Sequence, residues 1–465
     1  MTKKIIALLL LCSPFNALHS MAGGLMTNTN YHIAFDRMFA RGTTFDIDAI
    51  YSNPAGLAWG HEGWQLSFNV QKPFQYRDIE ASLNQPYATV VGIERHKFKG
   101  KATADPFVPA LFVSYKHNKW ALGFMAGIVG SGGKVTYKEG IPMFAVPVGG
   151  MMSQVAAGIN AQLPAGYPQV PGNFYNQDAY MQGKQYIYGI QANYTYRFNK
   201  HWSVAVGLRA NIYNGFNRGH VYVTSDNPIV QNAMGSSDLL RLNLDVDQNG
   251  VGINPLFSIN YKLDRLVLSG RYEFRSKLNI PNDTKTLSIT AAPSLQPQLG
   301  NVAPLAAPYQ DVVKTRYDMP ALLTLAAGYE FIPNKLRGAL EYHWFDDRHA
   351  KMQGNRQKEL KHGTREILAG VEWDINKTFT VSLGGQRTDY GLSDQYQSNT
   401  SFACDSYSIG LGGAVNLNNH LRLNIAYFCS LYSDYSRQTE YMSIPVSETY
   451  SRTNNVFGIG IDYKF

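Results

Sequence analysis

Regular alternation of apolar residues with small or polar ones is the feature of this sequence that most restricts its fold. Across residues 457–465, phenylalanine, isoleucine and tyrosine occupy the odd positions, while glycine, aspartate and lysine occupy the even ones. The same period of two recurs in residues 203–212, 406–415 and 421–427. Because successive side chains of a β-strand point to opposite faces of a sheet, each segment predicts a strand with one apolar face. The chain is therefore expected to be all-β.

Fourteen strand-like segments occur along the chain. They are residues 63–76, 104–116, 119–130, 183–197, 201–213, 250–262, 264–278, 316–331, 335–347, 362–375, 378–389, 403–416, 420–433 and 452–465. Single-chain bacterial barrels have an even number of strands, and roughly 9 to 11 residues suffice for a tilted strand to cross a bilayer. The pattern therefore predicts a transmembrane antiparallel up-and-down β-barrel rather than a soluble sandwich.

The connections between these segments alternate between short and long. Short turns near residues 118, 199, 264, 334, 376 and 418 each join two segments, and longer, irregular connections lie between them. Outer-membrane barrels have short turns at the periplasmic end and long loops at the other end. Tryptophans at positions 64, 120, 202 and 373 fall near the short turns, as expected for an interfacial aromatic belt.

The composition agrees with a barrel and argues against other classes. Aromatic residues make up 13% of the chain and there are 42 glycines, although the mean hydropathy of −0.24 resembles that of a soluble protein. Beyond the N-terminus we count no run of about 18 apolar residues, the length that a transmembrane helix needs. The net charge of +8 is modest for 465 residues and favours contact with anionic outer-membrane lipids over nucleic acid.

The N-terminus has the features of an export signal. Lys3 and Lys4 precede the apolar run 5–11, and residues 20–22 (SMA) provide the small residues that a signal peptidase recognises. A lipoprotein signal at Cys12 is the alternative, but Leu11 precedes that cysteine where a small residue is expected. Residues 1–22 are therefore predicted to be a cleaved signal peptide, and the barrel is expected in the outer membrane of a Gram-negative cell.

Residues 23–62 lie before the first strand and contain an unusual turn sequence. Asn53 followed by Pro54 favours a turn, Pro54 lacks an N–H group, and Gly56 permits conformations that other residues avoid. The segment could hang in the periplasm with an ordinary turn at residues 53–56. It could also fold up inside the barrel as a plug.

Three features of the sequence occur together. They are residues 48–58 (DAIYSNPAGLA), the fourteen strands that end at Phe465, and residues 317–320 (YDMP) with 341–344 (EYHW). In these features the chain resembles the FadL-type outer-membrane transporters of long-chain fatty acids and other hydrophobic compounds. The resemblance extends over essentially the whole mature chain. The Asn-Pro-Ala element in this context is its most specific part, since the strands alone would fit many barrels.

The resemblance implies a hatch at residues 23–62 that plugs the lumen of a barrel formed by residues 63–465. Asn53, Pro54, Ala55 and Gly56 match the hatch motif of the family. The resemblance also implies a groove between loops that captures the ligand, an apolar pocket inside the barrel, and a kink in the third strand that opens sideways into the membrane. Transport would then be passive diffusion.

The third predicted strand is rich in glycine. It contains Gly123, Gly127, Gly130, Gly132 and Gly133. Glycines inside a strand favour a bulge or bend, which agrees with the implied kink. The alternative is that these glycines only fit a crowded barrel wall.

Two of the long connections are more apolar than exposed loops usually are. They are residues 141–152 (IPMFAVPVGGMM) and 291–307 (AAPSLQPQLGNVAPLAA). Such loops could form an apolar surface that captures a hydrophobic ligand, or they could pack on one another as a lid. Both arrangements differ from the charged constriction of a water-filled porin.

A fatty acid carries a carboxylate, so a cation inside the barrel would be valuable in a pocket of low dielectric. By strand parity Arg209 and Arg422 point inward, and they are the candidate ligands for a carboxylate, with Arg209 first. The alternative is that these arginines pair with neighbouring acids for structural reasons alone.

Other motifs do not predict a catalytic, cofactor or metal site. Gly132-Gly133-Lys134 lacks the remaining residues of a phosphate-binding loop, because Val135 stands where serine or threonine is needed. His343 and His349 lie on the same side of one strand but roughly 20 Å apart if the strand is extended. The sequence contains no convincing pairing of a nucleophile with a base.

Cys404 and Cys429 remain after removal of the signal peptide. Pairing the last two hairpin strands about residues 418–419 places residue 408 opposite Cys429. The offset of four residues is about 13 Å along a strand, which exceeds the roughly 7 Å that a disulfide spans between Cα atoms. Both thiols are therefore expected to be free.

The sequence favours a monomeric barrel that takes up long-chain fatty acids or other hydrophobic molecules without a cofactor or bond chemistry. The first alternative is a structural or adhesin-like surface protein whose hatch never opens. A lipid-modifying enzyme is the second alternative, and it would require a serine and histidine pair at the lipid interface.

Overall fold

Fourteen antiparallel strands form a closed barrel in the computed structural model, which describes residues 26–27, 32–91, 93–103, 107–301 and 307–465. The strands of the ring are β1 (Gly63–Ser82), β3 (Val108–His117), β4 (Trp120–Tyr137), β5 (Asn176–Arg197), β6 (Trp202–Thr224), β7 (Asp238–Leu263), β8 (Leu266–Glu273), β11 (Leu322–Ile332), β12 (Leu336–Phe345), β13 (Arg365–Asp374), β14 (Phe379–Asp389), β15 (Ser406–Asn416), β16 (Leu421–Tyr432) and β18 (Ile444–Lys464). The ring closes between β1 and β18, where Gln65 pairs with Lys464 and Ser82 with Ser447. The prediction of an all-β barrel with fourteen strands is confirmed. The signal peptide predicted at residues 1–22 lies outside the described residues.

Several strands are longer than the sequence pattern predicts. β7 begins at Asp238 and runs for 26 residues, whereas alternation in the sequence begins only near residue 250. A strand of this length extends well beyond the roughly 9 to 11 residues that cross a bilayer, and its edge then needs a partner. β9 (Asn279–Ala291) provides it, because Leu240 pairs with Ala291 and Gln248 with Asn282.

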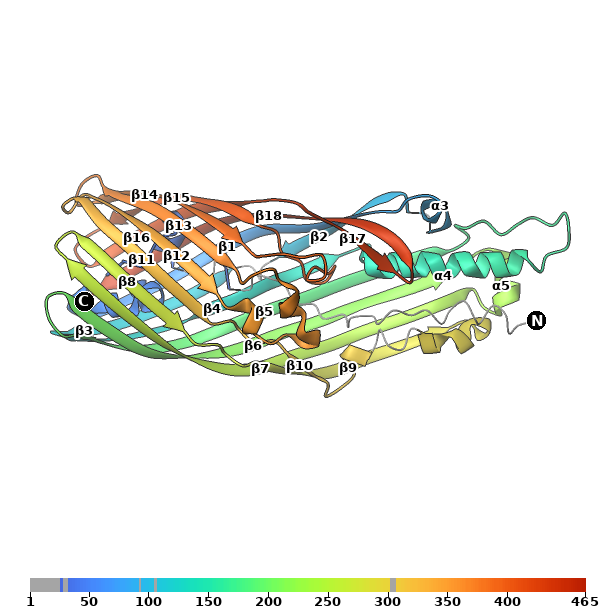
Figure 1. Cartoon of the computed structure of the whole chain (residues 1–465), viewed down its shortest axis with the longest axis horizontal. Coiled ribbons are helices and arrows are strands. Elements are labelled where there is room, and N and C mark those ends of the chain that lie inside the picture. Colours follow the sequence, from blue (N-terminus) through green and yellow to red (C-terminus); the bar gives the residue numbers. More distant parts are fainter. Residues whose placement is uncertain (1–25, 28–31, 92, 104–106, 302–306) are drawn as a thin grey trace.

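Three further strands lie in the long connections and were not predicted. β2 (Arg95–Thr103) pairs with the upper part of β1, β10 (Lys314–Arg316) with β9, and β17 (Tyr435–Tyr441) with β18. Together with β5, β6, β7 and β9 they extend the sheet on one side of the long-loop end (Figure 1).

The outer surface of the ring carries a continuous apolar belt. Along β15 the side chains of Tyr407, Ile409 and Leu411 are about half exposed, while the intervening residues are buried in the lumen. At the short-turn end, Trp64 and Trp373 are exposed, and the ring centroid of Trp64 lies 4.9 Å from that of Tyr115. An exposed apolar belt bordered by aromatic rings is the surface that a bilayer covers.

The apolar connection at residues 141–152 begins helix α4 (Pro142–Asn160), which is long and apolar enough to cross a membrane by length and composition alone. The helix instead lies along the extended sheet (Figure 1). Val148 and Met152 are buried against side chains of β6 and β7 such as Val223 and Leu240. Leu295 of the second apolar connection joins the same cluster. The described parts of the two connections thus pack against one another and against the extended sheet, which agrees with the packing in the second of the two arrangements considered from the sequence.

The remaining long connections are short helices and irregular segments. These helices are α3 (Tyr87–Val91), α5 (Pro228–Met234), η3 (Pro293–Asn301), η4 (Ala307–Tyr309), η5 (Asp347–His349) and η6 (Gln353–Glu359). Asn227 caps α5, since its side-chain oxygen accepts the N–H of Ile229 at 2.9 Å. α3 and α5 lie at the end of the molecule opposite the short turns, whereas the orange helices η5 and η6 lie nearer its middle (Figure 1).

Residues 32–62 lie inside the barrel, in the half that is nearest the short turns (Figure 1). They form α1 (Ile33–Arg37), α2 (Ala49–Ser52) and η2 (Pro54–Trp59), and most of their side chains are buried, although residues 61 and 62 are exposed. We call this described segment the hatch. Of the two placements considered from the sequence, the structure shows the one inside the lumen.

Candidate functional site: hatch and lumen

Glycines on the inner wall let the hatch approach the strands closely. Gly370, Gly384 and Gly458 point into the lumen, where a Cβ atom would lie 2.5–2.6 Å from atoms of Met38, Phe39 and Ile33 respectively. Gly328 and Gly410 meet the hatch in the same way. We call these five positions the glycine seat. Each of these glycines lies in a different strand, and only the structure shows that the hatch fills the space above them.

A buried ionic cluster binds the hatch to β13. The guanidinium of Arg37 pairs with the carboxylate of Glu372 and donates a hydrogen bond to Ser382 Oγ at 2.7 Å. Arg41 lies 3.8 Å from the same carboxylate, and Arg337 of β12 also pairs with it. Glu372 is fully buried. We call Arg37, Arg41 and Glu372 the latch.

Sequence reasoning missed the latch. The signal that could have found it is strand parity, because Glu372 occupies an inward position of β13, where an uncompensated carboxylate would be costly. No alternation rule, however, says which cation of a distant segment reaches that carboxylate.

The residues of the predicted hatch motif contact the opposite side of the wall, on β5 and β6. The carbonyl oxygens of Pro54 and Ala55 accept hydrogen bonds from Thr195 Oγ1 at 2.8 Å and Ser203 Oγ at 2.6 Å. Asn53 donates through Nδ2 to the carbonyl oxygen of Thr44 at 3.1 Å, which closes the hatch on itself. A Cβ atom at Gly56 would overlap the side chain of Asn53 and the oxygen of Thr44. The motif thus fixes the hatch backbone against serine and threonine hydroxyls of the wall.

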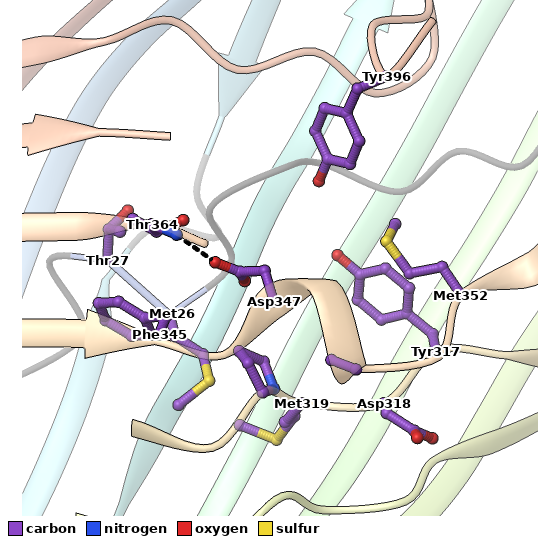
Figure 2. Close-up of a pocket in the computed structure, with 12 residues that line it drawn as sticks. Met26, Thr27, Tyr317, Asp318, Met319, Phe345, Asp347, Met352, Thr364 and Tyr396 are labelled. Carbon is purple, nitrogen blue, oxygen red and sulfur yellow. Dashed lines mark hydrogen bonds between the residues drawn. The ribbon is translucent and has the colours of Figure 1, made fainter. Parts of the chain in front are cut away.

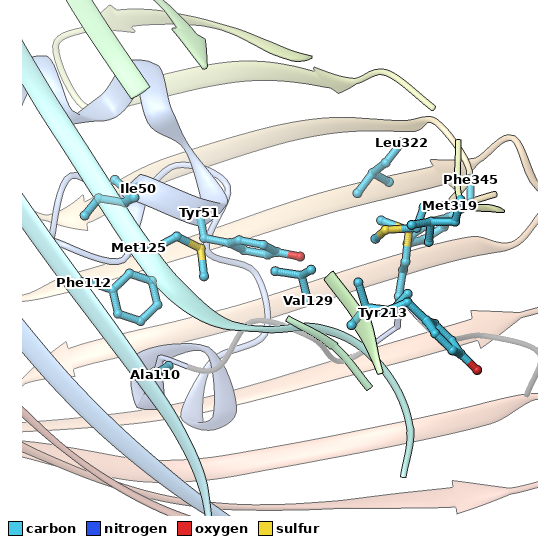
Figure 3. Close-up of a cluster of buried hydrophobic side chains, with 14 of the residues drawn as sticks. Ile50, Tyr51, Ala110, Phe112, Met125, Val129, Tyr213, Met319, Leu322 and Phe345 are labelled. Atoms are coloured by element: carbon cyan, nitrogen blue, oxygen red, sulfur yellow. The ribbon is translucent and has the colours of Figure 1, made fainter. Parts of the chain in front are cut away.

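Above the hatch, apolar side chains form a continuous column through the lumen (Figure 3). It begins at Ile50 and Tyr51 of the hatch, and it includes Phe112, Met125, Val129, Ile187, Tyr213, Leu278, Ile280, Tyr317, Met319, Leu322 and Phe345. In Figure 3, Val129 lies between Tyr51 of the hatch and the pair Met319 and Phe345, of which Phe345 ends β12. The lumen of this barrel is apolar at the level where a porin has a water-filled constriction.

A small cavity of about 40 Å³ lies at the loop end of this column (Figure 2). Met26 and Thr27, from the chain before the hatch, line it together with Tyr317, Met319 and Met352. Asp347 also faces it, and the N–H of Thr364 donates to the Asp347 carboxylate at 2.6 Å. Burial raises the pKa of Asp347 to about 6, although the bond from Thr364 favours the ionised form. Residues 317–320, which carry part of the sequence resemblance, line this cavity.

The third strand of the ring, β4, is irregular at its glycines. Its pairing with β5 shifts register between Ile128 and Gly130 and again between Ser131 and Gly133, so that Val129 and Gly132 are extra residues. Gly133 has a φ of +73°, a conformation that glycine adopts without strain. Two bulges so close together bend a strand and disrupt its ladder.

On its other side, β4 lacks a continuous partner. β3 pairs with β4 only up to Ala126, and β2 pairs with it only from Val135. Within the described residues, positions 127–134 of β4 therefore have no ladder partner on this side. A second cavity of about 40 Å³ adjoins this stretch and is lined by Gly132, Gly133 and Arg77 among others. We call positions 127–134 the β4 window.

Arg209 and Arg422 point into the barrel, but they differ in their partners. Arg209 is completely buried, forms an ion pair with Glu273 and donates to Gln191 Oε1 at 3.2 Å. Its guanidinium also lies 5.5 Å from the ring centre of Tyr51 in the hatch. Arg422 lines a cavity of about 450 Å³ at the short-turn end, between the hatch and the wall. Its Nη2 atom has no hydrogen-bond partner among the described residues.

One serine, one histidine and one aspartate meet inside the barrel without forming a nucleophilic triad. Ser67 Oγ lies 3.1 Å from His32 Nε2, and both groups contact Asp462 Oδ1, at 2.6 and 3.1 Å. His32 Nδ1 accepts the N–H of Ala34, so the ring proton is on Nε2 and is directed to Asp462. A triad needs the serine and the acid on different ring nitrogens. These residues instead fix the start of α1 against β1 and β18.

The polar residues near His343 likewise serve the wall. His343 contacts Glu341 at 2.6 Å and Glu366 at 2.8 Å, whereas His349 pairs with Asp346 at 2.6 Å. The two histidines therefore have separate partners, and the described residues contain no group of three potential ligands that could hold a metal ion.

Cys404 and Cys429 are both free, as predicted. Ile409 rather than residue 408 lies opposite Cys429, because the turn at residues 417–421 is one residue longer than predicted. Cys404 faces the inside and is buried, while Cys429 is partly exposed on the outer face of β16.

Comparison with known proteins yields similar structures but no similar sequence. The sequence matches no protein-family model and no curated protein. The structure is similar to that of a Pseudomonas aeruginosa FadL homologue, with a TM-score of 0.63 and 15% sequence identity over 96% of this chain and 100% of that chain. It is also similar to the Pseudomonas putida toluene transporter TodX, with a TM-score of 0.51 and 14% identity over 92% and 97% of the two chains.

A TodX mutant that is described as a monoaromatic hydrocarbon channel gives a TM-score of 0.55 at 13% identity, over 94% of this chain and 99% of that one. The shared features extend along the whole chain, whereas the identities are low, so the similarity concerns the arrangement of strands and hatch. The chain has the FadL-type fold, a closed barrel of fourteen strands with its N-terminal segment inside the lumen.

Proposed function

We propose that this chain is an outer-membrane transporter that lets hydrophobic molecules diffuse passively across the outer membrane of a Gram-negative cell. The apolar column above the hatch is the observation that carries the proposal. A column lined by Phe112, Met125 and Leu322 solvates a hydrocarbon, whereas ions and sugars would lose their hydration there. The similarity in structure to a hydrocarbon channel and a toluene transporter, at low sequence identity, supports the same class of substrate.

Entry begins at the long-loop end in this proposal. The cavity beside Met26 and Thr27 is closed in the structure, since about 40 Å³ is little more than the volume of one water molecule. A ligand must therefore displace the chain before the hatch or the side chains of Tyr317 and Met352. Methionine suits this role because its unbranched side chain repacks easily.

Exit is proposed to be lateral, at the β4 window. A hydrophobic molecule that leaves between β3 and β4 passes from the apolar column directly into lipid and never meets water. Gly127, Gly130, Gly132 and Gly133 support this route because small residues and bulges leave space in the wall. The hatch motif at residues 53–56 would hold the lower lumen shut during this passage.

Long-chain fatty acids are one substrate class within this proposal, and their carboxylate needs a partner. Arg422 has an unpartnered Nη2 atom in the cavity at the short-turn end, so a carboxylate reaches it only if the hatch moves. For Arg209 to bind a carboxylate, Glu273 must first give way. Uncharged hydrocarbons, the second class, need neither arginine.

A structural surface protein without transport is the second candidate function. The observation that favours it is the tight packing of the described lumen, where the cavity in the column is small and the hatch is held by buried ion pairs. Both candidates have the same fold, so only binding and uptake separate them. The proposal involves no bond chemistry, no cofactor and a monomeric barrel.

The test is equilibrium binding of purified, delipidated protein to long-chain fatty acids and to uncharged hydrocarbons of similar length, followed by uptake into proteoliposomes. Leu322→Gln places an amide in the column and should weaken binding of both classes by about tenfold, from the lost apolar contact and the buried amide. Tyr167→Gln, at an exposed loop residue, is the matched control. Arg422→Gln should weaken binding of the acids only.

The outcomes distinguish the candidates. Saturable binding that Leu322→Gln weakens and Tyr167→Gln leaves intact supports the transporter. Equal binding of acids and hydrocarbons by Arg422→Gln and the parent removes Arg422 as the carboxylate ligand but keeps the transporter. Absence of binding to every compound supports the structural protein.

A further inference from the structure

We propose that a patch of lysines on the outer face of the barrel binds the phosphate groups of an anionic lipid in the outer leaflet. The lysine patch consists of Lys99 and Lys101 on β2, Lys134 on β4, Lys138 just after it, and Lys184 on β5. The inference rests on the outer-membrane placement in the proposed function, but it concerns a different surface and a different ligand.

The ladders bring these lysines together. Lys101 of β2 pairs with Thr136 of β4, and two residues away along β4 Lys134 lies directly opposite Lys184 of β5. The same side of β4 carries Thr136, whose hydroxyl accepts a hydrogen bond from Gln182 of β5 at 2.9 Å. Two lysines that face each other across neighbouring strands repel, so this pair destabilises the sheet unless an anion lies between them.

The surrounding charges show that the patch is not neutralised by the protein. Neighbouring Lys97 pairs with Asp78 at 3.1 Å and Arg95 with Glu80 at 2.6 Å. In contrast, within the part of the chain that the structure describes, none of the five patch lysines has a carboxylate oxygen within 4 Å. Lys184 instead lies 5.3 Å from the ring centre of Phe216. Asp78 lies directly opposite Lys99 in the ladder, but its carboxylate pairs with Lys97, which lies outside the patch.

The patch lies at the height of the lipid headgroups. Below it, exposed aromatic rings of Phe74, Tyr76 and Phe107 mark the outer edge of the apolar belt, and Lys101 pairs with Tyr76 across β1 and β2. The segment from Trp64 to Phe74 on β1 spans about 25 Å of membrane thickness at the usual strand tilt, which matches the apolar band of such barrels.

Phosphate groups match this surface in charge and geometry. An ammonium group donates up to three charge-assisted hydrogen bonds, and phosphate oxygens accept them. A lipid that bears two phosphates can bridge lysines on neighbouring strands, while its acyl chains cover the aromatic rings below. Basic clusters next to a membrane surface attract anionic lipids in the same way.

The probe for this proposal is diphosphorylated lipid A, added to purified parent protein in neutral detergent, with dephosphorylated lipid A and inorganic phosphate as comparisons. The test variant is Lys101→Gln/Lys134→Gln/Lys184→Gln. The control variant, Lys200→Gln/Lys335→Gln/Lys377→Gln, removes the same charge from exposed positions in the short turns at the other end. Bound lipid is counted by native mass spectrometry across a titration, and the heat-modifiable mobility of each variant on gels verifies that the barrel is folded.

We expect the parent and the control variant to bind diphosphorylated lipid A with the same affinity. The test variant should bind it on the order of tenfold to a hundredfold more weakly, given the contribution of each lysine near a charged surface. If it fails to fold, Lys134→Gln alone, which should weaken binding by less, replaces it.

Equal affinity of test variant and parent, or equal binding of the dephosphorylated lipid, overturns the proposal. Competition by millimolar inorganic phosphate would show a site for free phosphate rather than for lipid, and would overturn it as well. Binding of hydrocarbon is measured on the same preparations. If the parent binds hydrocarbon but not the lipid, only this inference is overturned. If the parent binds the lipid but not hydrocarbon, the proposed transport is overturned and the lipid site remains supported.

Discussion

Two parts of the barrel wall differ in the regularity of their strand pairing. From β12 to β16 the strands pair without a register shift, and this regular wall carries the latch residue Glu372 and most of the glycine seat. β4, in contrast, has two bulges on one side and the β4 window on the other. The latch ties the hatch to the regular part of the wall, whereas the ladder is broken on β4, where a ligand is proposed to leave.

The largest effect is expected from breaking the latch. Glu372→Ala leaves Arg37, Arg41 and Arg337 without their shared carboxylate, and removal of one partner of a buried ion pair costs about 3 to 5 kcal/mol. We expect a lower unfolding temperature in detergent and a higher ion conductance in planar bilayers, because the hatch loosens. Glu80→Ala, at an exposed ion pair, is the control and should cost at most about 1 kcal/mol. Indistinguishable behaviour of the two variants would contradict the role of the latch.

The loop end of the regular wall should respond to pH through Asp347. The pKa of Asp347 in the folded protein, about 6, lies above the usual 3.8. Between these two values the carboxyl is protonated in the folded protein and ionised in the unfolded chain. The stability that the bound proton contributes is therefore lost as the pH rises through 6. The free energy of unfolding of Asp347→Asn, relative to that of the parent, should therefore rise by up to about 3 kcal/mol between pH 4 and pH 7. Urea unfolding at both pH values measures it.

Asp283→Asn, at an exposed carboxylate, is the control for this pH effect and should follow the profile of the parent. An Asp347→Asn variant whose stability relative to the parent does not change with pH would show that the carboxyl at position 347 is not held in its protonated form by burial.

The glycine seat can be tested against the outer face of the same strand. Gly384→Val places a side chain into Phe39 and should destabilise the closed hatch by about 1 to 3 kcal/mol, the usual cost of overpacking. At the neighbouring Gly385, which faces outward, the nearest atom to an added Cβ is Ser408 O at 3.8 Å. Gly385→Val should therefore be close to neutral. Protease access to the hatch, measured for both variants, reports its position, and equal cleavage would argue against a close-fitting seat.

The irregular wall can be made regular. Deletion of both Val129 and Gly132 removes the two extra residues and keeps the alternation of β4 in phase. Uptake of hydrocarbon into proteoliposomes should fall on the order of tenfold, as when a gating step is lost, while equilibrium binding persists. Deletion of two residues from the exposed loop at 165–166 is the control. Undiminished uptake by the β4 variant would place the exit elsewhere.

The smallest effect distinguishes the two faces of one hairpin. Burial raises the pKa of the Cys404 thiol to about 12, so its reactive thiolate is scarce at neutral pH. Cys429, on the outer face of β16, is partly exposed. We expect maleimide to label Cys429 first in the folded protein and both thiols after denaturation, as read by mass spectrometry. Faster labelling of Cys404 would mean that the loop before β15 opens readily.

Much of the fold could be predicted because the barrel imposes an alternating pattern on the sequence of each strand. Each membrane-crossing strand must present apolar side chains to lipid at every second position, and this requirement holds whatever its neighbours are. Strand number, inward orientation of Arg209 and Arg422, and free cysteines all follow from that local rule. The unpredicted strands β2, β9, β10 and β17 lie where no lipid imposes it.

Less of the candidate site could be predicted from the sequence. Residues 53–56 were recognisable as a turn, yet their partners Thr195 and Ser203 lie about 140 residues away. The ion pair of Arg209 with Glu273 was likewise hidden, because it depends on the register of β6, β7 and β8 rather than on parity. The apolar connection at residues 141–152 gave no sign of whether it would be exposed or buried.

By itself, the sequence determined that this chain is a fourteen-stranded barrel with an apolar outer belt, because alternation is a property of each strand alone. Only the tertiary structure decided where the hatch lies, that Arg37 and Arg41 meet Glu372, and that five lysines from β2, β4 and β5 share one surface. These contacts join segments far apart in the chain. Their energies depend on distance and burial after the ring has closed, which no local pattern records.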